Sequence, residues 1–356
     1  MKIVTVIGNR PQFIKAAAVS PVLRREHEEV LIHTGQHYDD ALSAVFFAEL
    51  GIPAPDRDLG IGGGTNASQT ARMLAALEPL LADACPDVLV VYGDTNSTLA
   101  GALAGAMAGV AVAHVEAGMR SFDRTMPEEL SRVLTDHAST LLLCSSEAAV
   151  ENLRREGVAG EVELVGDVMV DLALRAQPRA RARLDLLAAH RVDPREYVLA
   201  TVHRAGNVDD PVRLEQLVEL LLAIPHPLVL PLHPRTRSRL ETNDLLSRLE
   251  AAPHVRLSAP IGYLELTALL CNAAAVLTDS GGIQKEAYLA RVPCVTLRGA
   301  TEWVETVEVG WNVLVDLDPQ AALRAIAGTP PSEHPPLYGD GQAAERVLAA
   351  LTLHCQ

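Results

Sequence analysis

Three acidic side chains stand where a parallel sheet would present them to a ligand. Asp94 and Glu116 each follow an apolar run, and Glu128 and Glu129 stand behind Pro127 at a helix start. Taken singly, Asp94 could cap a helix and Glu128 could complement a helix dipole. Because the carboxyl ends of parallel strands meet at one edge, we expect Asp94, Glu116 and Glu128 to converge. Such crowding would raise the pKa of at least one carboxyl, which makes it a usable acid or base near neutral pH.

A turn suited to phosphate binding lies in the second half of the chain. An apolar run breaks into Asp279-Ser280-Gly281-Gly282, and a helix is expected to begin there. Free backbone N–H groups at a helix start bind phosphate, and Glu286, one turn on, could accept hydrogen bonds from ribose hydroxyls. The turn is neither a GxGxxG motif with a distant acid nor a GK[ST] loop. NAD and ATP are therefore disfavoured, and we expect no cofactor.

Basic and aromatic side chains at other strand ends or helix starts could complete an anion or base site. The alternatives are ordinary surface cations, a structural histidine and a core aromatic. The candidates are Arg10 and Lys15 after the first apolar run, His203 and Arg204 after the run at 197–201, His233 one strand later, and Tyr263 at a helix start.

The cysteines and the His114-Val115-Glu116 sequence do not form a metal site. HxE occurs in zinc deaminases with a PCxxC partner, whereas Pro293-Cys294 has no second cysteine. The cysteines are odd in number and form no CxxC pair, so we predict reduced, buried thiols. They are Cys85, Cys144, Cys271, Cys294 and Cys355.

Length and composition narrow the class of protein. At 356 residues and 49% hydrophobic content the chain exceeds the size of one hydrophobic core, so two domains are expected. The net charge of -15 and the absence of a basic run interleaved with aromatics exclude a nucleic-acid partner. No run is long enough for a signal peptide core or a membrane span. We expect a cytoplasmic protein without a membrane partner.

Short β-branched runs alternate with stretches of helical period, as in parallel strands joined by crossover helices. The charged stretch 171–195 is expected to hold a helix and the domain crossing. We therefore predict an α/β fold of two doubly wound Rossmann-like domains, 1–170 and 171–339, with the C-terminal helix 340–356 joining the first. Strands are expected near 2–7, 29–34, 87–92, 110–115, 140–144, 197–201, 228–232, 255–257, 275–278, 293–296 and 312–315. Helices are expected to open near Pro11, Asp39, Asn66, Asn96, Pro127, Glu147, Asp209, Pro234, Leu264, Gly281 and Pro319.

The motifs together closely resemble the non-hydrolysing UDP-N-acetylglucosamine 2-epimerase family. The matching stretches are GNRPQFIK, HTGQHYD, VYGDTNST, HVEAGMRS, MPEE, TVHR, LPLHPRT, LTDSGGIQKEA and TEWVETVEVGWN, spread from residue 8 to residue 312. The resemblance implies a GT-B-like architecture with the active site in the interdomain cleft, a UDP-sugar substrate, a homodimer and a role in cell-surface polysaccharide biosynthesis.

The resemblance also implies a reaction in two halves. UDP leaves by anti elimination across C1 and C2 to give a 2-acetamidoglucal, and is then added back with the opposite C2 configuration. Asp94, Glu116 and Glu128 would handle protons at the sugar, and His203 would support catalysis. UDP would be held by Arg10, Lys15, Arg204, His233, Tyr263, Ser280, Gly281, Gly282 and Glu286.

One departure from the family pattern and one further similarity leave alternatives open. The family usually carries an acid in its TxHRxEN motif where this chain has Gly206, so a loop contact is expected to be lost. The DSGGIQKEA, TEW and LYGDGQA combination is also similar to the branch acting on UDP-2,3-diacetamido-2,3-dideoxyglucuronic acid. A hydrolysing epimerase that releases ManNAc and UDP, a retaining glycosyltransferase and a non-catalytic UDP-sugar sensor are the other hypotheses.

Overall fold

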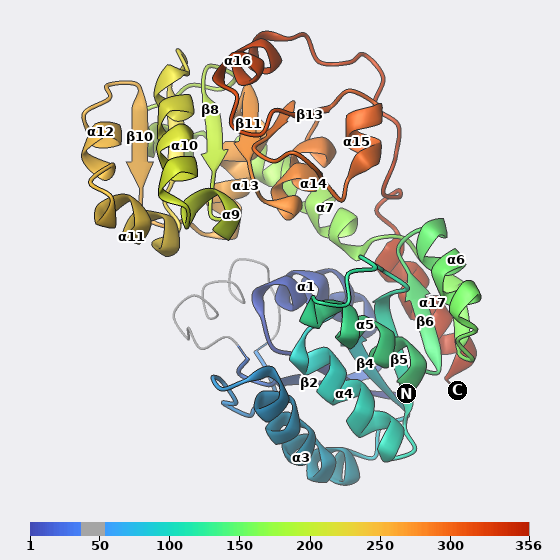
Figure 1. The fold of residues 1–356 in the computed structure, drawn as a ribbon. Coiled ribbons are helices and arrows are strands. Elements are labelled where there is room, and N and C mark those ends of the chain that lie inside the picture. The colour runs from blue at the N-terminus through green and yellow to red at the C-terminus, as the bar shows by residue number, and fades with distance from the viewer. Residues whose placement is uncertain (37–53, 356) are drawn as a thin grey trace. The chain divides into compact units, whose positions relative to one another are not determined.

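The computed structural model describes residues 1–36 and 54–355, and for Arg10 the backbone alone. The chain divides into two compact units (Figure 1). Unit 1 comprises Met1–Leu172 and Tyr338–Gln356, and unit 2 comprises Ala173–Leu337. Each unit contains one parallel sheet whose described strands alternate with helices along most of the chain, which confirms the predicted α/β class.

Unit 1 is built on a seven-stranded parallel sheet of order β3-β2-β1-β4-β5-β6-β7. The chain winds outward from β1 in one direction and from β4 in the other, so the switch point lies between these two strands. The strands are β1 (Lys2–Ile7), β2 (Glu28–His33), β3 (Arg57–Asp58), β4 (Val88–Tyr92), β5 (Ala111–Ala117), β6 (Leu141–Cys144) and β7 (Glu161–Leu164).

Helices of unit 1 bury the apolar strand faces. Val6 and Val91, paired across β1 and β4, pack with Met73 and Leu77 of α3. The chain's last helix belongs to this unit, because Asp171 accepts hydrogen bonds from the first backbone N–H groups of α17. The helices are α1 (Arg10–Leu23), α3 (Asn66–Ala84), α4 (Asn96–Met107), α5 (Pro127–Ala138), α6 (Glu147–Glu156) and α17 (Ala343–His354), and α7 (Val168–Ala182) leads into unit 2.

Unit 2 repeats the plan with a six-stranded parallel sheet of order β10-β9-β8-β11-β12-β13. Its switch point lies between β8 and β11, which pair from Val198↔Ala275 to Thr201↔Thr278. The strands are β8 (Val198–Thr201), β9 (Leu228–Pro231), β10 (Val255–Ser258), β11 (Ala275–Thr278), β12 (Cys294–Thr296) and β13 (Asn312–Leu314).

Leu217 and Leu221 of α10 pack on one face of the second sheet, and Leu269 of α13 packs on the other. The helices are α8 (Leu184–Ala189), α9 (Ala205–Val208), α10 (Pro211–Ala223), α11 (Pro234–Thr242), α12 (Leu246–Glu250), α13 (Tyr263–Asn272), α14 (Gly281–Leu289), α15 (Val304–Glu308) and α16 (Pro319–Ala327). Among the described residues no helix is long and apolar enough to cross a bilayer.

The structure differs from the sequence expectations at a few elements. β3 has two residues and β7 reads Glu-Val-Glu-Leu, so neither contains the apolar run that predicts a buried strand. The helix expected near Asp39 lies outside the described residues. All five cysteines are free. Cys144, Cys271 and Cys294 are buried as predicted, whereas Cys355 is half-buried and Cys85 is exposed where α3 ends, so the prediction of a buried thiol is wrong at Cys85.

Candidate active site

A cavity of about 300 Å³ opens at the switch point of unit 1. Residues that follow β1 form one wall and residues that follow β4 form another, which is where doubly wound sheets bind ligands. Helix α5 supplies a third side. The lining residues with the closest bearing on chemistry are Asn9, Gln12, Lys15, Asp94, Asn96 and Glu128.

Hydrogen bonds within the two strand ends shape this cavity. The amide of Gln12 donates to the carbonyl of Tyr92 at 2.9 Å, and its oxygen accepts from the N–H of Gly8 at 2.7 Å. Gln12 therefore ties the end of β1 to the end of β4. A capping box of Thr95 and Thr98 begins α4. The cap interpretation of Asp94 is therefore wrong, and its carboxylate is available for another role.

Glu116 sits on a strained part of β5. Its φ is +75°, and the pairing of β5 with β6 shifts between Val115 and Ala117, which marks a β-bulge. A non-glycine residue in this conformation costs about 1–3 kcal/mol and is typical of functional sites. The bulge turns the Glu116 side chain toward Lys15, whose ammonium donates to the Glu116 carboxylate.

Lys15 keeps its positive charge in this buried position. Burial lowers the pKa of Lys15, but the charge and hydrogen bond of Glu116, with the charges of Asp94 and Asp167, raise it above 10.5 overall. The Lys15 side chain is 8% exposed and lines the cavity. A cation therefore stands beside the carboxylates, which the crowding argument from sequence did not include.

Glu128 is exposed at the first turn of α5, on the cavity. Pro127 suits this position, and Glu128 and Glu129 complement the positive end of the helix dipole. No described residue forms a hydrogen bond or ion pair with the Glu128 carboxylate, so the dipole interpretation and a catalytic role are both compatible with its placement.

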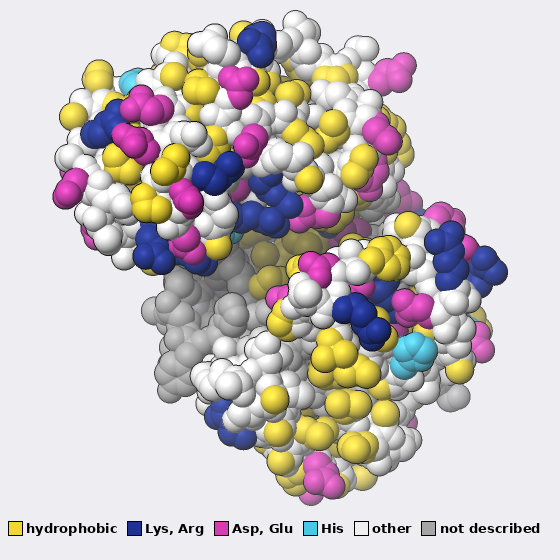
Figure 2. All heavy atoms as spheres, viewed as in Figure 1, with side chains coloured by type: hydrophobic (Ala, Val, Ile, Leu, Met, Phe, Trp, Pro, Cys, Tyr) yellow, Lys and Arg dark blue, Asp and Glu magenta, His cyan; other side chains and the backbone are white. Residues whose placement is uncertain are grey.

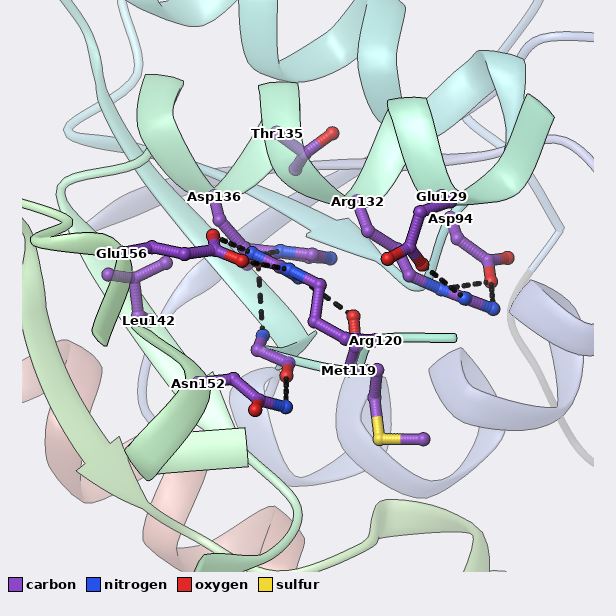
Figure 3. Close-up of polar contacts among 12 residues, drawn as sticks. Asp94, Met119, Arg120, Glu129, Arg132, Thr135, Asp136, Leu142, Asn152 and Glu156 are labelled. Carbon is purple, nitrogen blue, oxygen red and sulfur yellow. Dashed lines mark hydrogen bonds and ion pairs between the residues drawn. The ribbon is translucent and has the colours of Figure 1, made fainter. Parts of the chain in front are cut away.

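A buried ionic network lies under the loop between β5 and α5 (Figure 3). The Asp136 carboxylate contacts Nδ1 of His114 and Nη1 of Arg120, both at 2.7 Å. Arg120 continues to Glu156 at 2.7 Å, and Nε2 of His114 donates to the carbonyl of Gly93 at 2.7 Å. The network therefore braces the turn that carries Asp94. Both nitrogens of His114 are engaged in these contacts.

Arg132 and Asp94 form an ion pair that the sequence reasoning missed. Nη2 of Arg132 lies 2.5 Å from Asp94, and its Nη1 lies 3.1 Å from Glu129. The spacing of Glu129 and Arg132 on a helix could have shown their own pairing. The contact with Asp94, 38 positions earlier, exists only in the folded chain.

The second candidate site lies at the switch point of unit 2. Asp279, fully buried after β11, accepts hydrogen bonds from the backbone N–H groups of His203 and Arg204 at 3.0–3.2 Å. The Asn207 side chain donates to the same carboxylate at 3.2 Å. Asp279 therefore holds the turn after β8. The His203 ring is 42% exposed and stacks on the ring of His233, with centroids 5.3 Å apart.

The Ser280-Gly281-Gly282 turn begins α14 without a side-chain cap. The Ser280 N–H donates to the Thr278 hydroxyl at 3.0 Å, so it is not available to a phosphate in this arrangement. The N–H groups of Gly281 and Gly282 have no acceptor among the described residues. They are the backbone donors that an anion could use.

A carboxylate already lies beside this turn. A Cβ built on Gly281 would come within 2.7 Å of Oε1 of Glu302, and Glu302 pairs with Arg298 at 2.7 Å and Arg204 at 3.4 Å. Burial raises the pKa of Glu302, but these hydrogen bonds and charges lower it below 4.5 overall. Two arginines and a helix start thus form an anion-binding environment that the sequence reasoning identified only in part.

The remaining candidates are placed as follows. Tyr263 is 3% exposed at the start of α13, which favours the core interpretation over stacking on a base. His233 caps α11 through the N–H of Arg235 and is exposed. Glu286 lies half-buried one turn into α14, and the side chain of Arg10 lies outside the described residues.

Comparison with known proteins identifies the family. The family model described as UDP-N-acetylglucosamine 2-epimerase matches residues 22–352. The chain belongs to this family. A UDP-N-acetylglucosamine 2-epimerase homolog of Methanococcus maripaludis is 47% identical over 354 residues, with 99% of each chain covered. The UDP-2,3-diacetamido-2,3-dideoxy-D-glucuronate 2-epimerase of Pseudomonas aeruginosa is 47% identical over 363 residues, again with 99% of each covered.

Solved structures of the epimerase family share the fold. The UDP-GlcNAc 2-epimerase of Methanocaldococcus jannaschii, in complex with UDP-GlcNAc and UDP, has a TM-score of 0.86 and 40% identity, covering 99% of this chain and 100% of that chain. This match confirms the resemblance and the GT-B-like class of two doubly wound units.

Gly206 stands where the epimerase family usually carries an acid. Gly206 lies in α9, and a Cβ at this position would have no other atom within 4 Å, so a larger side chain would point into open space. Its neighbour Asn207 is buried and donates to Asp279 and to the carbonyl of Leu297 at 2.9 Å. The His203 turn is therefore anchored without an acid at position 206.

Proposed function

We propose that the chain interconverts UDP-GlcNAc and UDP-ManNAc by reversible epimerisation at C2. The observation that carries the proposal is the set of acids at the switch point of unit 1. Asp94, Glu128 and Lys15 line one cavity, and Lys15 holds Glu116 beside them. Binding a UDP-sugar does not require several carboxylates, whereas moving a proton on and off carbon does. No cofactor is part of the proposal.

The proposed reaction is an anti elimination followed by re-addition. A carboxylate removes the C2 proton, the C2–H electron pair forms the C1=C2 double bond, and the C1–O electron pair leaves with UDP. UDP then adds back to C1 of the 2-acetamidoglucal while a proton is delivered to the opposite face of C2. Asp94, Glu116 and Glu128 carry these protons, and Lys15 supplies positive charge next to them.

UDP is proposed to bind unit 2 at its own switch point. The N–H groups of Gly281 and Gly282, the Ser280 hydroxyl and the cations near them suit a pyrophosphate. Glu286 would accept hydrogen bonds from the ribose. The remaining cationic and titratable contacts that unit 2 offers in the proposal are His203, Arg204 and His233.

The deciding experiment is NMR of the protein with UDP-GlcNAc in deuterated water. Deuterium entering C2 of an intact UDP-sugar supports epimerisation. Free ManNAc together with UDP would instead identify a hydrolysing epimerase. A protein that binds UDP-GlcNAc without exchange or turnover of any tested sugar would be a sensor, and the proposal would fail.

A second substrate is favoured by one specific observation. The Pseudomonas aeruginosa relative named for UDP-2,3-diacetamido-2,3-dideoxy-D-glucuronate is 47% identical, as is the Methanococcus maripaludis UDP-N-acetylglucosamine 2-epimerase homolog, whereas the Methanocaldococcus jannaschii UDP-N-acetylglucosamine 2-epimerase is 41% identical. The same exchange experiment with the diacetamido uronate, at matched concentration, therefore belongs beside the first. A higher kcat/KM for the uronate would assign the chain to that substrate without changing the reaction.

We also propose a homodimer formed through α3, α4 and α5. Met107 is 78% exposed, Leu130 53% and Leu134 41%, and an apolar cavity of about 650 Å³ lies between α3 and α4. Figure 2 shows hydrophobic side chains gathered over α4 and α5 on this face. Surfaces of this kind mark protein contacts. Light scattering should give twice the monomer mass, and Met107→Glu should shift the protein toward monomer.

A cytoplasmic location is proposed with this function. All five cysteines are free, which fits a reducing compartment.

A further inference from the structure

The guanidinium of Arg132 lies between two carboxylates in unit 1 (Figure 3). Its Nε and Nη2 both donate to Oδ2 of Asp94, at 2.9 and 2.5 Å. Its Nη1 donates to Oε2 of Glu129 at 3.1 Å. The side chain is only 18% exposed, so water screens these contacts weakly.

Glu129 fixes the far side of the guanidinium. It is 3% exposed and accepts hydrogen bonds at 2.9 Å from the N–H and hydroxyl of Ser121 and from the N–H of Phe122. Phe122 has a φ of +58°, so Glu129 also stabilises a strained turn. Arg132 is thereby attached to a rigid support rather than to a mobile surface acid.

The contact with Arg132 distinguishes the two oxygens of Asp94. Oδ2 receives both donors, while no described residue donates to Oδ1. Asp94 lines the cavity, whereas Arg132 is absent from the described residues that line it. Glu129 and Arg132 both lie on α5, so the contact with Asp94 is the one that joins this helix to the turn after β4.

We propose that Arg132 is a positioning residue that fixes the Asp94 carboxylate through Oδ2 and presents its Oδ1 to the cavity. The inference rests on the proposed function, in which Asp94 exchanges a proton with C2 of the sugar. Proton transfer requires the acceptor oxygen at a defined position, and a displacement of about 1 Å can lower a rate on the order of 10²-fold. The arginine has no role in holding UDP.

The test measures C2 exchange and UDP affinity in three variants of the full chain. Arg132→Gln removes the charge, and Arg132→Lys keeps it without the planar fork that reaches both carboxylates. Arg155→Gln is the matched control, since Arg155 pairs with Glu151 at 2.8 Å on the surface of α6. We expect R132Q to lower kcat on the order of 10²-fold with KM and the Kd of UDP within about threefold.

The kcat of R132K should be about tenfold higher than that of R132Q, because lysine keeps the charge. R155Q should retain the wild-type kcat. Wild-type kcat in R132Q, or a loss confined to KM and UDP affinity, would overturn the assignment of Arg132. If circular dichroism shows that R132Q does not fold, R132K becomes the deciding variant. A wild-type kcat in R132K would then overturn the assignment of Arg132. Failure of the proposed function is distinguishable, because the wild-type protein would then show no C2 exchange.

Discussion

The ammonium of Lys15 donates to the carboxylate of Glu116, a residue 101 positions later in the chain whose φ is +75°. The backbone strain at Glu116 and the buried position of Lys15 are both unfavourable in isolation. Their ion pair compensates for part of each cost and places a charged pair at the switch point of unit 1.

Removing the carboxylate of Asp94 or of Glu116 should lower the rate of C2 exchange without weakening UDP binding. Asp94→Asn or Glu116→Gln is expected to reduce C2 exchange on the order of 10²–10⁴-fold, because the amide cannot accept the proton. UDP affinity, measured by isothermal titration calorimetry, should stay nearly unchanged. A large loss of UDP binding would mean that the division of roles between unit 1 and unit 2 is wrong.

The two glycines of the phosphate turn should respond oppositely to alanine. In Gly281→Ala the new Cβ would meet the Glu302 carboxylate at 2.7 Å and displace it from Arg298 and Arg204, so the free energy of unfolding should fall by up to about 1 kcal/mol. At Gly282 the nearest atom is 4.0 Å away, and alanine suits a helix better than glycine by about 0.5–1 kcal/mol. Urea unfolding measures the free energy of unfolding of the two variants. Equal stability of the two variants would show that Glu302 moves aside freely.

Asp136 should make stability depend on acidic pH. Burial raises its pKa, but hydrogen bonds and charges of His114 and Arg120 lower it below 3.8 overall. A pKa that is lower in the folded protein gives stability that is present above the unfolded value and lost as pH falls through the folded value. Asp136→Asn should therefore cost about 3–5 kcal/mol at pH 7, and the difference from wild type should shrink below about pH 4.

The measurement for Asp136 is urea unfolding at pH 7, 5, 4 and 3.5. Asp185→Asn is the control, since Asp185 pairs with Arg183 on the surface at 2.8 Å and should change stability little at any of these pH values. A pH-independent gap between wild type and Asp136→Asn would contradict the ionic explanation.

Gly206→Glu tests whether the acid that the family usually carries contributes to UDP binding here. The position has open space and a helical backbone, so the substitution should leave stability equal or higher by up to about 1 kcal/mol. UDP affinity should stay within about threefold, because Asn207 and Asp279 already hold the His203 turn. A tenfold gain in affinity would show instead that a ligand contact is missing in the natural chain. Gly206→Gln separates the effect of charge from that of size.

The fold was predictable to a large extent because its signals are local. Each predicted inner strand, such as Lys2–Ile7 or Ala275–Thr278, is a short apolar run buried on both faces. Helix starts at Asn66, Pro127 and Pro319 carry the capping residues or prolines that the rules require. The edge strands β3 and β7 were not predicted, because a strand that is half-exposed at the edge of a sheet needs no apolar run.

The candidate site was predictable only in its residue types. Strand ends in a parallel sheet face one edge, so Asp94, Glu116 and Glu128 could be selected from sequence. Their partners could not, because the Lys15–Glu116 and Asp94–Arg132 contacts join positions 101 and 38 residues apart. A β-bulge at Glu116 and the Glu302 carboxylate beside Gly281 depend in the same way on how distant segments pack.

The sequence by itself therefore determined the α/β class, the family and the acids at the strand ends, since these follow from hydrophobic period, turn residues and ordered motifs. The tertiary structure decided which cation pairs with which acid, that Thr95 rather than Asp94 caps α4, and which N–H groups of the phosphate turn are open. The physical reason is that charge pairing and hydrogen-bond direction act over a few ångströms in space, whatever the separation along the chain.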